Sequence, residues 1–420
     1  MLDTLASAWK LEDLRKKIFF TLAMFIVFRL GAHVPLPGIN NAVLAELVKG
    51  GTILGFFDVI SGGAFKRFTI FAMGIMPYIN ASIIMQLLTV VIPALERLAK
   101  EDIEGRKKIV QYTRYGTVIL GLLQALGMAL YLARSGAFLR PGIYNYLVVA
   151  VMLTAGTAFL MWLGELITEK GIGNGISLII FAGIVSRLPA GAVSIYQYLT
   201  SGTVSIFSLL LFAIIAVVII AAVVAMQQGE RRISVQYAKR VVGRRVYGGQ
   251  STHIPLKVNQ AGVIPVIFAM SILMFPSTLA SWFPQNSFAQ AIVAFFEPRS
   301  AFYMALYALL IIFFTYFYTA VTFNPQDVAD NMKKYGGFIP GLRPGRPTQE
   351  YIERILTRIT LSGAIFLAFI AVLPNIIMAV TGINVYFGGT SLLIVVGVAL
   401  ETMKQLESHL LLRHYQGFMK

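Results

Sequence analysis

The stretch from Leu209 to Val224 reads LLLFAIIAVVIIAAVV and contains no polar or charged residue. The hydrocarbon core of a bilayer is about 30 Å thick, and roughly 20 apolar residues cross it as an α-helix. A helix is required because the bilayer interior offers no water to backbone N–H and C=O groups. With its apolar neighbours, this stretch predicts a transmembrane helix over Val204–Met226.

Further stretches of the same character lie on both sides of it. Only 13% of the 420 residues are charged and 57% are hydrophobic, whereas soluble domains carry about 25% charged residues. This composition argues against a soluble enzyme, a disordered protein and a fibrous protein. The expected fold class is an all-α polytopic membrane protein with ten transmembrane helices, the remaining nine being Ile18–Val34, Phe71–Val91, Thr113–Leu132, Tyr144–Leu166, Ile176–Ala192, Val263–Trp282, Ala301–Phe323, Ile359–Val380 and Val385–Met403.

The basic residues are distributed unevenly between the two sides of the expected spans. The chain holds 35 Lys and Arg residues against 19 Asp and Glu. Most of the Lys and Arg residues lie at the termini and in the loops after the second, sixth and eighth spans. Because cytoplasmic loops are enriched in Lys and Arg, we expect both termini to face the cytoplasm.

The spans divide into two sets of five, over residues 1–190 and 191–420. Since five crossings reverse the direction of the chain, a structural repeat between the two halves must be inverted, as in many transporters and channels. No sequence match between the halves is evident. The segment Gly183–Gly202 joins them and contains Pro189 and Gly191. Either a hinge or an ordinary outer loop fits this composition.

Branched aliphatic residues recur at helical spacing in the second and fifth spans. Ile75, Ile79 and Ile83 are four residues apart, and Ile176 and Ile180 repeat that spacing. A packed or lipid-facing stripe is the ordinary interpretation. The functional alternative is a ring of aliphatic side chains that closes a pore, since apolar constrictions can exclude water.

The second span and the segment before it have unusual features. Pro77 is expected to kink the span. Residues 53–60 read ILGFFDVI and are too short to cross a bilayer, and Ser61, Gly62 and Gly63 interrupt the apolar run. The segment is expected to lie at the outer interface as a short helix or to re-enter the protein, because irregular backbone at membrane depth needs protein or water around it.

The sequence lacks the residues of several other functional classes. Ion-coupled transporters carry ionisable groups at membrane depth, and the spans hold almost none; Arg29, near the outer end of the first span, is within snorkelling reach of the interface. The deep polar residues are amides and hydroxyls, mostly expected to form interhelical hydrogen bonds. There is no cysteine, no zinc-binding H-E-x-x-H motif and no phosphate-binding G-x-x-x-x-G-K-[ST] motif. We therefore expect no catalytic residues, no metal and no cofactor.

Two long basic loops, over residues 227–262 and 324–358, remain to be explained. The first alternates apolar and basic residues around Gly243 and around Gly248 and Gly249, which predicts a β-hairpin. The second contains three turn-forming pairs of Gly and Pro residues between Gly336 and Gly345. Topology and attraction to anionic lipid account for the charge. Docking to a polyanionic surface such as ribosomal RNA, or to an acidic protein partner, would also account for the length of the loops.

Six segments, in collinear order over nearly the whole chain, resemble the SecY family, whose members are the central subunits of the protein-translocation channel. They are SGGAFKRFTIFAMGIMPYINASIIMQLLTVV (Ser61–Val91), QYTRYGT (Gln111–Thr117), WLGELITEKGIGNGISLIIFAGI (Trp162–Ile184), YAKRVVGRRVYGGQSTHIPLKVNQAGVIPVIFA (Tyr237–Ala269), NPQDVADNMKKYGGFIPGLRPG (Asn324–Gly345) and FGGTSLLIVVGVALE (Phe387–Glu401).

The resemblance implies a fold and a set of functional residues. The fold would be two inverted five-helix halves around a central pore, hinged between the fifth and sixth spans. A plug would occupy about residues 53–64, with Phe56, Phe57, Asp58, Ser61, Gly62 and Gly63. The pore ring would consist of Ile75, Ile79, Ile83, Ile176, Ile180, Ile267 and Ile394.

The same resemblance implies a lateral gate, docking sites and partners. Gln86, Gln124 and Asn259 would lie at or near the gate, a seam between spans 2–3 and spans 7–8. The ribosome and the motor ATPase SecA would dock on the loops that hold Arg240, Arg244, Arg245, Arg343 and Arg346. SecE and SecG would be membrane partners in the bacterial inner membrane, in contact with anionic lipid, and the substrate would be an unfolded preprotein with a signal sequence. A secondary transporter of a small solute and a scaffold without a conduit remain as alternatives.

Overall fold

Each of the ten expected spans overlaps a helix in the computed structural model, although the fifth, Ile176–Ala192, is broken between α9 and the helix that follows it. The helices are α2 (Glu12–Gly31), α5 (Met76–Val91), α7 (Ile103–Arg134), α8 (Ile143–Lys170), α9 (Gly175–Val185), α11 (Ile206–Gln228), α12 (Ile264–Ser281), α14 (Ala301–Thr322), α16 (Arg346–Thr381) and α17 (Gly389–Gly417). The structure describes residues 9, 11–40, 43–44, 58, 61–100, 103–202, 206–237, 240–242, 245–247, 251–283, 286–297, 300–381 and 389–417.

Several of these helices satisfy a strict test of length and apolar composition for a membrane span. Among the described residues, 6 helices pass, or 7 if α5 and the short helix α6 (Pro93–Lys100), which bends away from it by 105°, count as one span. The chain is therefore a multi-pass membrane protein. α16 has 36 residues and is about 54 Å long at 1.5 Å per residue, so it extends well beyond the hydrocarbon core.

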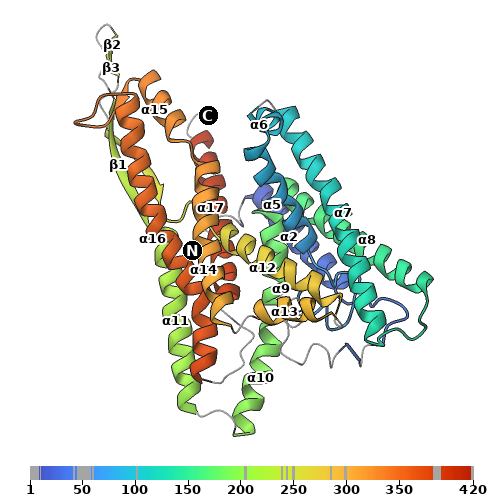
Figure 1. Cartoon of the computed structure of the whole chain (residues 1–420). Helices are drawn as coiled ribbons and strands as arrows, with labels where there is room; N and C mark the ends of the chain where they lie inside the picture. The colour runs from blue at the N-terminus through green and yellow to red at the C-terminus, as the bar shows by residue number, and fades with distance from the viewer. Residues whose placement is uncertain are drawn as a thin grey trace.

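The helices of the two halves pack in the same pattern. In the first half α8 contacts α2, α5, α7 and α9, while α7 contacts α5 and α2 contacts α9. When these five helices are matched in order with α11, α12, α14, α16 and α17, every pair has its counterpart in the second half. The halves meet where α5 contacts α12 and α9 contacts α17, and each of these helices is the counterpart of its partner. Figure 1 shows α7 and α8 on one side, α11 and α16 on the other, and α12 between them.

The expectation that Pro77 kinks the second span is wrong. α5 begins at Met76, with Pro77 in its first turn, and residues 71–75 form turns. The first N–H groups of a helix have no intrahelical partner, so proline costs nothing there and its fixed φ favours helix initiation. Pro77 therefore starts the helix and leaves its axis unbroken.

The segment that joins the halves is helical over much of its length. α10 (Leu188–Thr200) follows α9 after a break at Ser186 and Arg187, and Pro189 lies in its first turn. An ordinary outer loop is therefore the wrong description for residues 188–200. The hinge remains a prediction.

The two long basic loops form one small domain at one end of the molecule (Figure 1). β1 (Glu230–Tyr237) pairs antiparallel with β4 (Ser251–Lys257) and with the short β5 (Gly337–Phe338). β2 (Arg240–Val242) and β3 (Arg245–Tyr247) pair antiparallel, which confirms the predicted hairpin. The sheet packs against α15 (Pro325–Lys334) and α16 through buried residues that include Ile233, Val235, Leu256, Met332 and Ile352. At the opposite end lies α10, and α13 (Ser287–Phe295) packs against α12.

The close approach of α8 to the turns before α5 depends on Gly156 of α8. A Cβ atom built at this position would lie 1.9 Å from the carbonyl oxygen of Ile70. We expect Gly156→Ala to lower the stability of the protein by about 1–3 kcal/mol, because neither backbone can yield without losing other contacts. Thermal unfolding of the purified protein in detergent measures the effect.

Gly116→Ala in α7 is the matched control, since its Cβ would make an ordinary contact 3.5 Å from Ala81 Cβ. Equal melting temperatures for the two variants would contradict the close approach at Gly156.

Candidate functional site

A buried apolar junction lies where the two halves meet. It contains six of the seven isoleucines expected in a pore ring, at exposures of 1–5% and within one hydrophobic cluster. α5 and the residue before it contribute three of them, and α9, α12 and α17 contribute one each. The six are Ile75, Ile79, Ile83, Ile180, Ile267 and Ile394.

Ile176 is placed differently from these six. It is half-buried at the edge of the same cluster. Its Cδ1 atom packs on α8, where a Cβ built on Gly164 would lie 2.4 Å from it. The side chain of Ile176 therefore fills the space between α9 and α8.

The described part of the predicted plug is buried and tightly turned. Asp58 and Ser61 are 1% and 4% exposed, while Phe56 and Phe57 lie outside the described residues. Gly62 and Gly63 have φ angles of 68° and 87°, which favour glycine. A Cβ atom on Gly62 would also lie 3.1 Å from the Cα of Gly183 in α9. The turn therefore needs glycine both for its backbone angles and for its approach to α9.

The seam between α5, α7 and α12 is closed by specific contacts. On α7, Gly127 leaves space for the indole of Trp282, which directly follows α12; a Cβ on Gly127 would lie 2.0 Å from that ring. Arg134 of α7 donates a hydrogen bond of 2.7 Å from Nη1 to the backbone oxygen of Trp282. Its guanidinium carbon also lies 5.7 Å from the centre of the Phe283 ring, a cation–π contact. These contacts join the two halves at one end of the seam.

The three polar residues expected at the lateral gate do not form a cluster through any described hydrogen bond. Gln86 of α5 donates to Ser82 Oγ at 3.3 Å, and its buried Oε1 has no partner in the described part of the chain. Gln124 is half-buried on α7. Asn259 donates to the carbonyl of Gly262 at 2.9 Å, just before α12.

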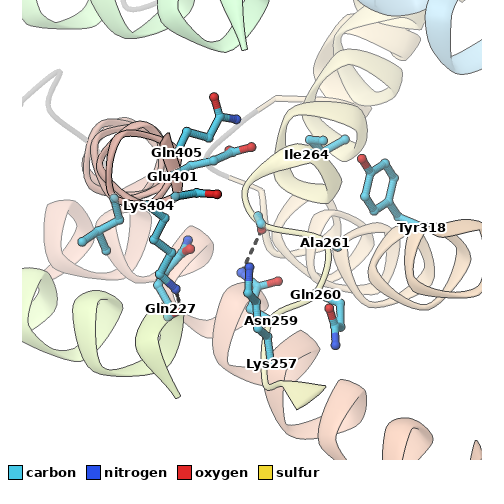
Figure 2. Close-up of a pocket in the computed structure, with 13 residues that line it drawn as sticks. Gln227, Lys257, Asn259, Gln260, Ala261, Ile264, Tyr318, Glu401, Lys404 and Gln405 are labelled. Carbon is cyan, nitrogen blue, oxygen red and sulfur yellow. Dashed lines mark hydrogen bonds between the residues drawn. The ribbon is translucent and has the colours of Figure 1, made fainter. Parts of the chain in front are cut away.

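Asn259 lines a pocket of about 340 Å³ near the N-terminal end of α12 (Figure 2). Every residue around the pocket belongs to the second half of the chain, and Lys404 of α17 crosses to the carbonyl of Gln227 at 3.0 Å. The structure therefore gives Asn259 neighbours from its own half. The lining residues are Gln227, Lys257, Asn259, Gln260, Ala261, Gly262, Ile264, Tyr318, Leu400, Glu401, Lys404, Gln405 and Ser408.

The predicted docking arginines lie at the end of the molecule that carries the sheet. Arg240 and Arg245 are in the strands of the β2–β3 hairpin, and Arg244 lies outside the described residues. Arg343 and Arg346 are exposed. The ion pair between Arg346 and Glu350, 3.2 Å apart, is also exposed and contributes little to stability.

Comparison with known proteins decides the family. The SecY family model matches residues 69–403. The protein translocase subunit SecY of Halalkalibacterium halodurans is 51% identical over 431 residues, covering 100% of both chains. The chain belongs to the SecY family.

Solved structures of the SecY family share the fold. A structure titled for the plug domain of SecY, which is said there to stabilise the closed state and maintain a membrane seal, has a TM-score of 0.67 and 19% identity, covering 94% of this chain and 92% of that one. Sec61 in a canine ribosome-channel complex has a TM-score of 0.65 and 18% identity, with the same coverage. The all-α polytopic membrane fold is confirmed.

Some residues of this SecY chain that join its parts were missed by the sequence analysis. Arg134, Gly127 and Trp282 carry no motif, and only a pairing of α7 with α12 could have selected them. Arg29 was expected to snorkel, yet it donates to the carbonyl of Gly62 at 2.9 Å. Arg187 pairs with Asp58. The sequence signal for Arg29 and Arg187 was a charged residue close to a membrane span, because such residues usually pair with another charge or with a backbone carbonyl.

The Gly127–Trp282 contact gives a direct test of the closed seam. Gly127→Ala should displace the indole, because the new methyl group would overlap the ring. In a background where Trp9 and Trp162 are Phe, we expect the fluorescence emission of Trp282 to change in wavelength and in accessibility to a soluble quencher.

Gly121→Ala on the same helix is the control, since its Cβ would meet ordinary neighbours at 3.8 Å or more. An unchanged Trp282 emission in Gly127→Ala would show that the two helices do not meet there.

Proposed function

We propose that this chain forms the channel of a bacterial protein translocase. It passes unfolded secretory polypeptides across the inner membrane and releases hydrophobic segments sideways into lipid. The observation that carries the proposal is the junction of six buried isoleucines contributed by both halves. The names of the full-length relatives agree with this function.

Isoleucines suit a channel that must be closed when idle and unselective when open. Their branched side chains exclude water, and an ion that enters such a constriction loses its hydration without gaining a partner. They also offer no hydrogen bond or charge to a passing peptide, so no particular sequence is retained. Because Ile176 packs against Gly164, the proposed ring rests on the other six.

The seam between α5, α7 and α12 is the proposed lateral gate. Two polar contacts join α12 to α5 and α7 among the described residues: Ser271 Oγ lies 3.9 Å from Met76 Sδ, and Arg134 bonds to the backbone of Trp282. Apolar contacts of this kind can be replaced by contacts with a hydrophobic segment or with lipid tails at little cost. Opening would therefore require separation of the two halves, 1–190 and 191–420, about the segment near α10.

The position of the basic residues at one end of the molecule supports the proposed partners. Exposed Arg343 and Arg346 and the β2–β3 hairpin lie at one end, which the distribution of Lys and Arg assigns to the cytoplasm together with both termini. A basic surface attracts polyanions and acidic proteins, and a solved relative is a ribosome-channel complex. We assign this end to the ribosome and to SecA, and the apolar helix faces to SecE, SecG and anionic lipid. The energy for transport comes from these partners, and the chain itself is not an enzyme.

Crosslinking to a translocating polypeptide tests the channel directly. The chain has no native cysteine, so Ile79→Cys, Ile180→Cys and Ile394→Cys each provide a single reactive site. A stalled secretory chain with one cysteine should form a disulfide with each of them, since all three line the proposed ring.

Ile84→Cys is the matched control, because Ile84 is also on α5 but is 45% exposed on the surface of the structure. Equal crosslinking at Ile84 and Ile79, or none at the three ring positions, would refute the proposed path.

Charge reversal tests the motor-docking surface. Arg343→Glu should reduce SecA-driven export at least about tenfold, because the new carboxylate would repel an acidic partner surface that the arginine attracts. It should leave the fold of the loop intact, because the backbone oxygen of Arg343, and not its side chain, accepts a bond of 2.9 Å from Thr348 Oγ1. Export is measured with inverted membrane vesicles.

Thr348→Val is the matched control: it removes that internal bond and keeps the charge. If Thr348→Val blocks export as strongly as Arg343→Glu, the effect belongs to loop folding rather than to docking.

A further inference from the structure

A charged group is buried within the predicted plug. The carboxylate of Asp58 belongs to a residue that is 1% exposed. Its Oδ1 accepts a hydrogen bond of 2.7 Å from the backbone N–H of Lys66, and its Oδ2 pairs with Nη1 of Arg187. A buried carboxylate is costly unless it is paired, so Asp58 is stable in this position only while Arg187 is in contact with it.

A second arginine binds the same turn from another helix. Arg29 of α2 donates from Nη1 to the carbonyl of Gly62 at 2.9 Å and to Ser186 Oγ at 3.1 Å. Ser186 Oγ in turn donates to the carbonyl of Gly183 at 2.7 Å. The turn is thereby tied to α2 and to the end of α9 at the same time.

The turn itself is internally bonded and closely fitted. The N–H of Gly63 donates to the carbonyl of Asp58 at 2.8 Å, and the N–H of Phe65 donates to Ser61 Oγ at 3.2 Å. A Cβ on Gly62 would lie 3.0 Å from Ser186 Oγ. These bonds hold Asp58 and residues 61–65 together, and the side chains of Arg29 and Arg187 attach the turn to its surroundings.

Arg187 links the turn to the segment that joins the two halves. It lies at the break between α9 and α10, where the chain leaves the first half for the second. A displacement of α10 would therefore pull Arg187 away from Asp58. The unpaired carboxylate would then favour exit into water, and the turn would follow it.

We infer that Asp58, Arg187 and Arg29 are positioning residues that latch the predicted plug shut and release it when the two halves separate. The inference rests on the proposed function and assigns the closed state to one ion pair and one pair of hydrogen bonds. Because Arg187 retains only 25% side-chain exposure and Asp58 1%, salt screens the pair weakly.

Labelling of one buried cysteine measures the latch without reference to transport. Ala64 is fully buried in the turn, and Ala64→Cys adds a single thiol to a chain that has none. A membrane-impermeant maleimide, applied to proteoliposomes from the side of the plug, should label this thiol slowly in the parent. We expect roughly tenfold faster labelling in Asp58→Asn and in Arg187→Gln, because each leaves its partner charge unpaired.

The double variant Asp58→Asn with Arg187→Gln separates a latch from two independent defects. If the two residues act through each other, the double variant labels no faster than either single variant. Multiplied effects would overturn the pairing, as would single variants that label as slowly as the parent. Lys66→Gln is the matched control, since Asp58 contacts the backbone and not the side chain of Lys66.

Ion conductance of the same proteoliposomes links the latch to the channel. Idle leak should rise in the single variants in parallel with labelling, while each variant elutes as a monodisperse species in gel filtration. Faster labelling without any leak would overturn the role of the latch in closure. If the parent itself transports no polypeptide, the proposed channel function fails, whereas the labelling result still decides whether the ion pair holds the turn.

Discussion

The absence of water from the bilayer core is the constraint on which the structure of this protein depends. Every backbone polar group at that depth must be paired within the protein, so the chain crosses as helices. Apolar attraction does not distinguish a neighbouring helix from lipid, and helices therefore associate through close contact. Glycines allow this close contact. A Cβ on Gly156 would lie 1.9 Å from the carbonyl oxygen of Ile70, and a Cβ on Gly175 would lie 1.9 Å from the carbonyl oxygen of Gly164. The first contact brings α8 close to the turns before α5, and the second brings α9 close to α8.

The same constraint separates polar from apolar contacts along the molecule. The six isoleucines lie in a hydrophobic cluster, whereas two ion pairs of the first half lie outside that cluster. Arg187 binds Asp58 of the predicted plug, and Arg114 of α7 pairs with Glu165 of α8 at 2.8 Å. The isoleucine cluster itself therefore holds no charge pair that would have to be broken if it parted. The specific contacts are made by charged side chains, which can exchange their protein partners for water.

The isoleucines illustrate the limit of a sequence pattern. Spacing of four residues places Ile75, Ile79 and Ile83 on one face of a helix, but a packed stripe and a pore ring have the same spacing. Family resemblance selected the ring. The tertiary structure then buried six of the seven together and set Ile176 against α8. The placement of Ile176 depends on Gly164, which is twelve residues away in the chain and leaves a space that no periodicity could reveal.

The sequence by itself determined the membrane class and the approximate positions of the ten helices. These properties depend on local composition and on the thickness of the bilayer, which is why Leu209–Val224 was unambiguous. It also predicted the β2–β3 hairpin from alternation and glycine. Only the tertiary structure decided that Pro77 starts α5, that Asn259 lines a second-half pocket, and that Arg29 and Arg187 converge on residues 58–62. Each of these depends on contacts between segments that are distant in the chain, and hydrophobicity carries no information about which partner a polar side chain will find.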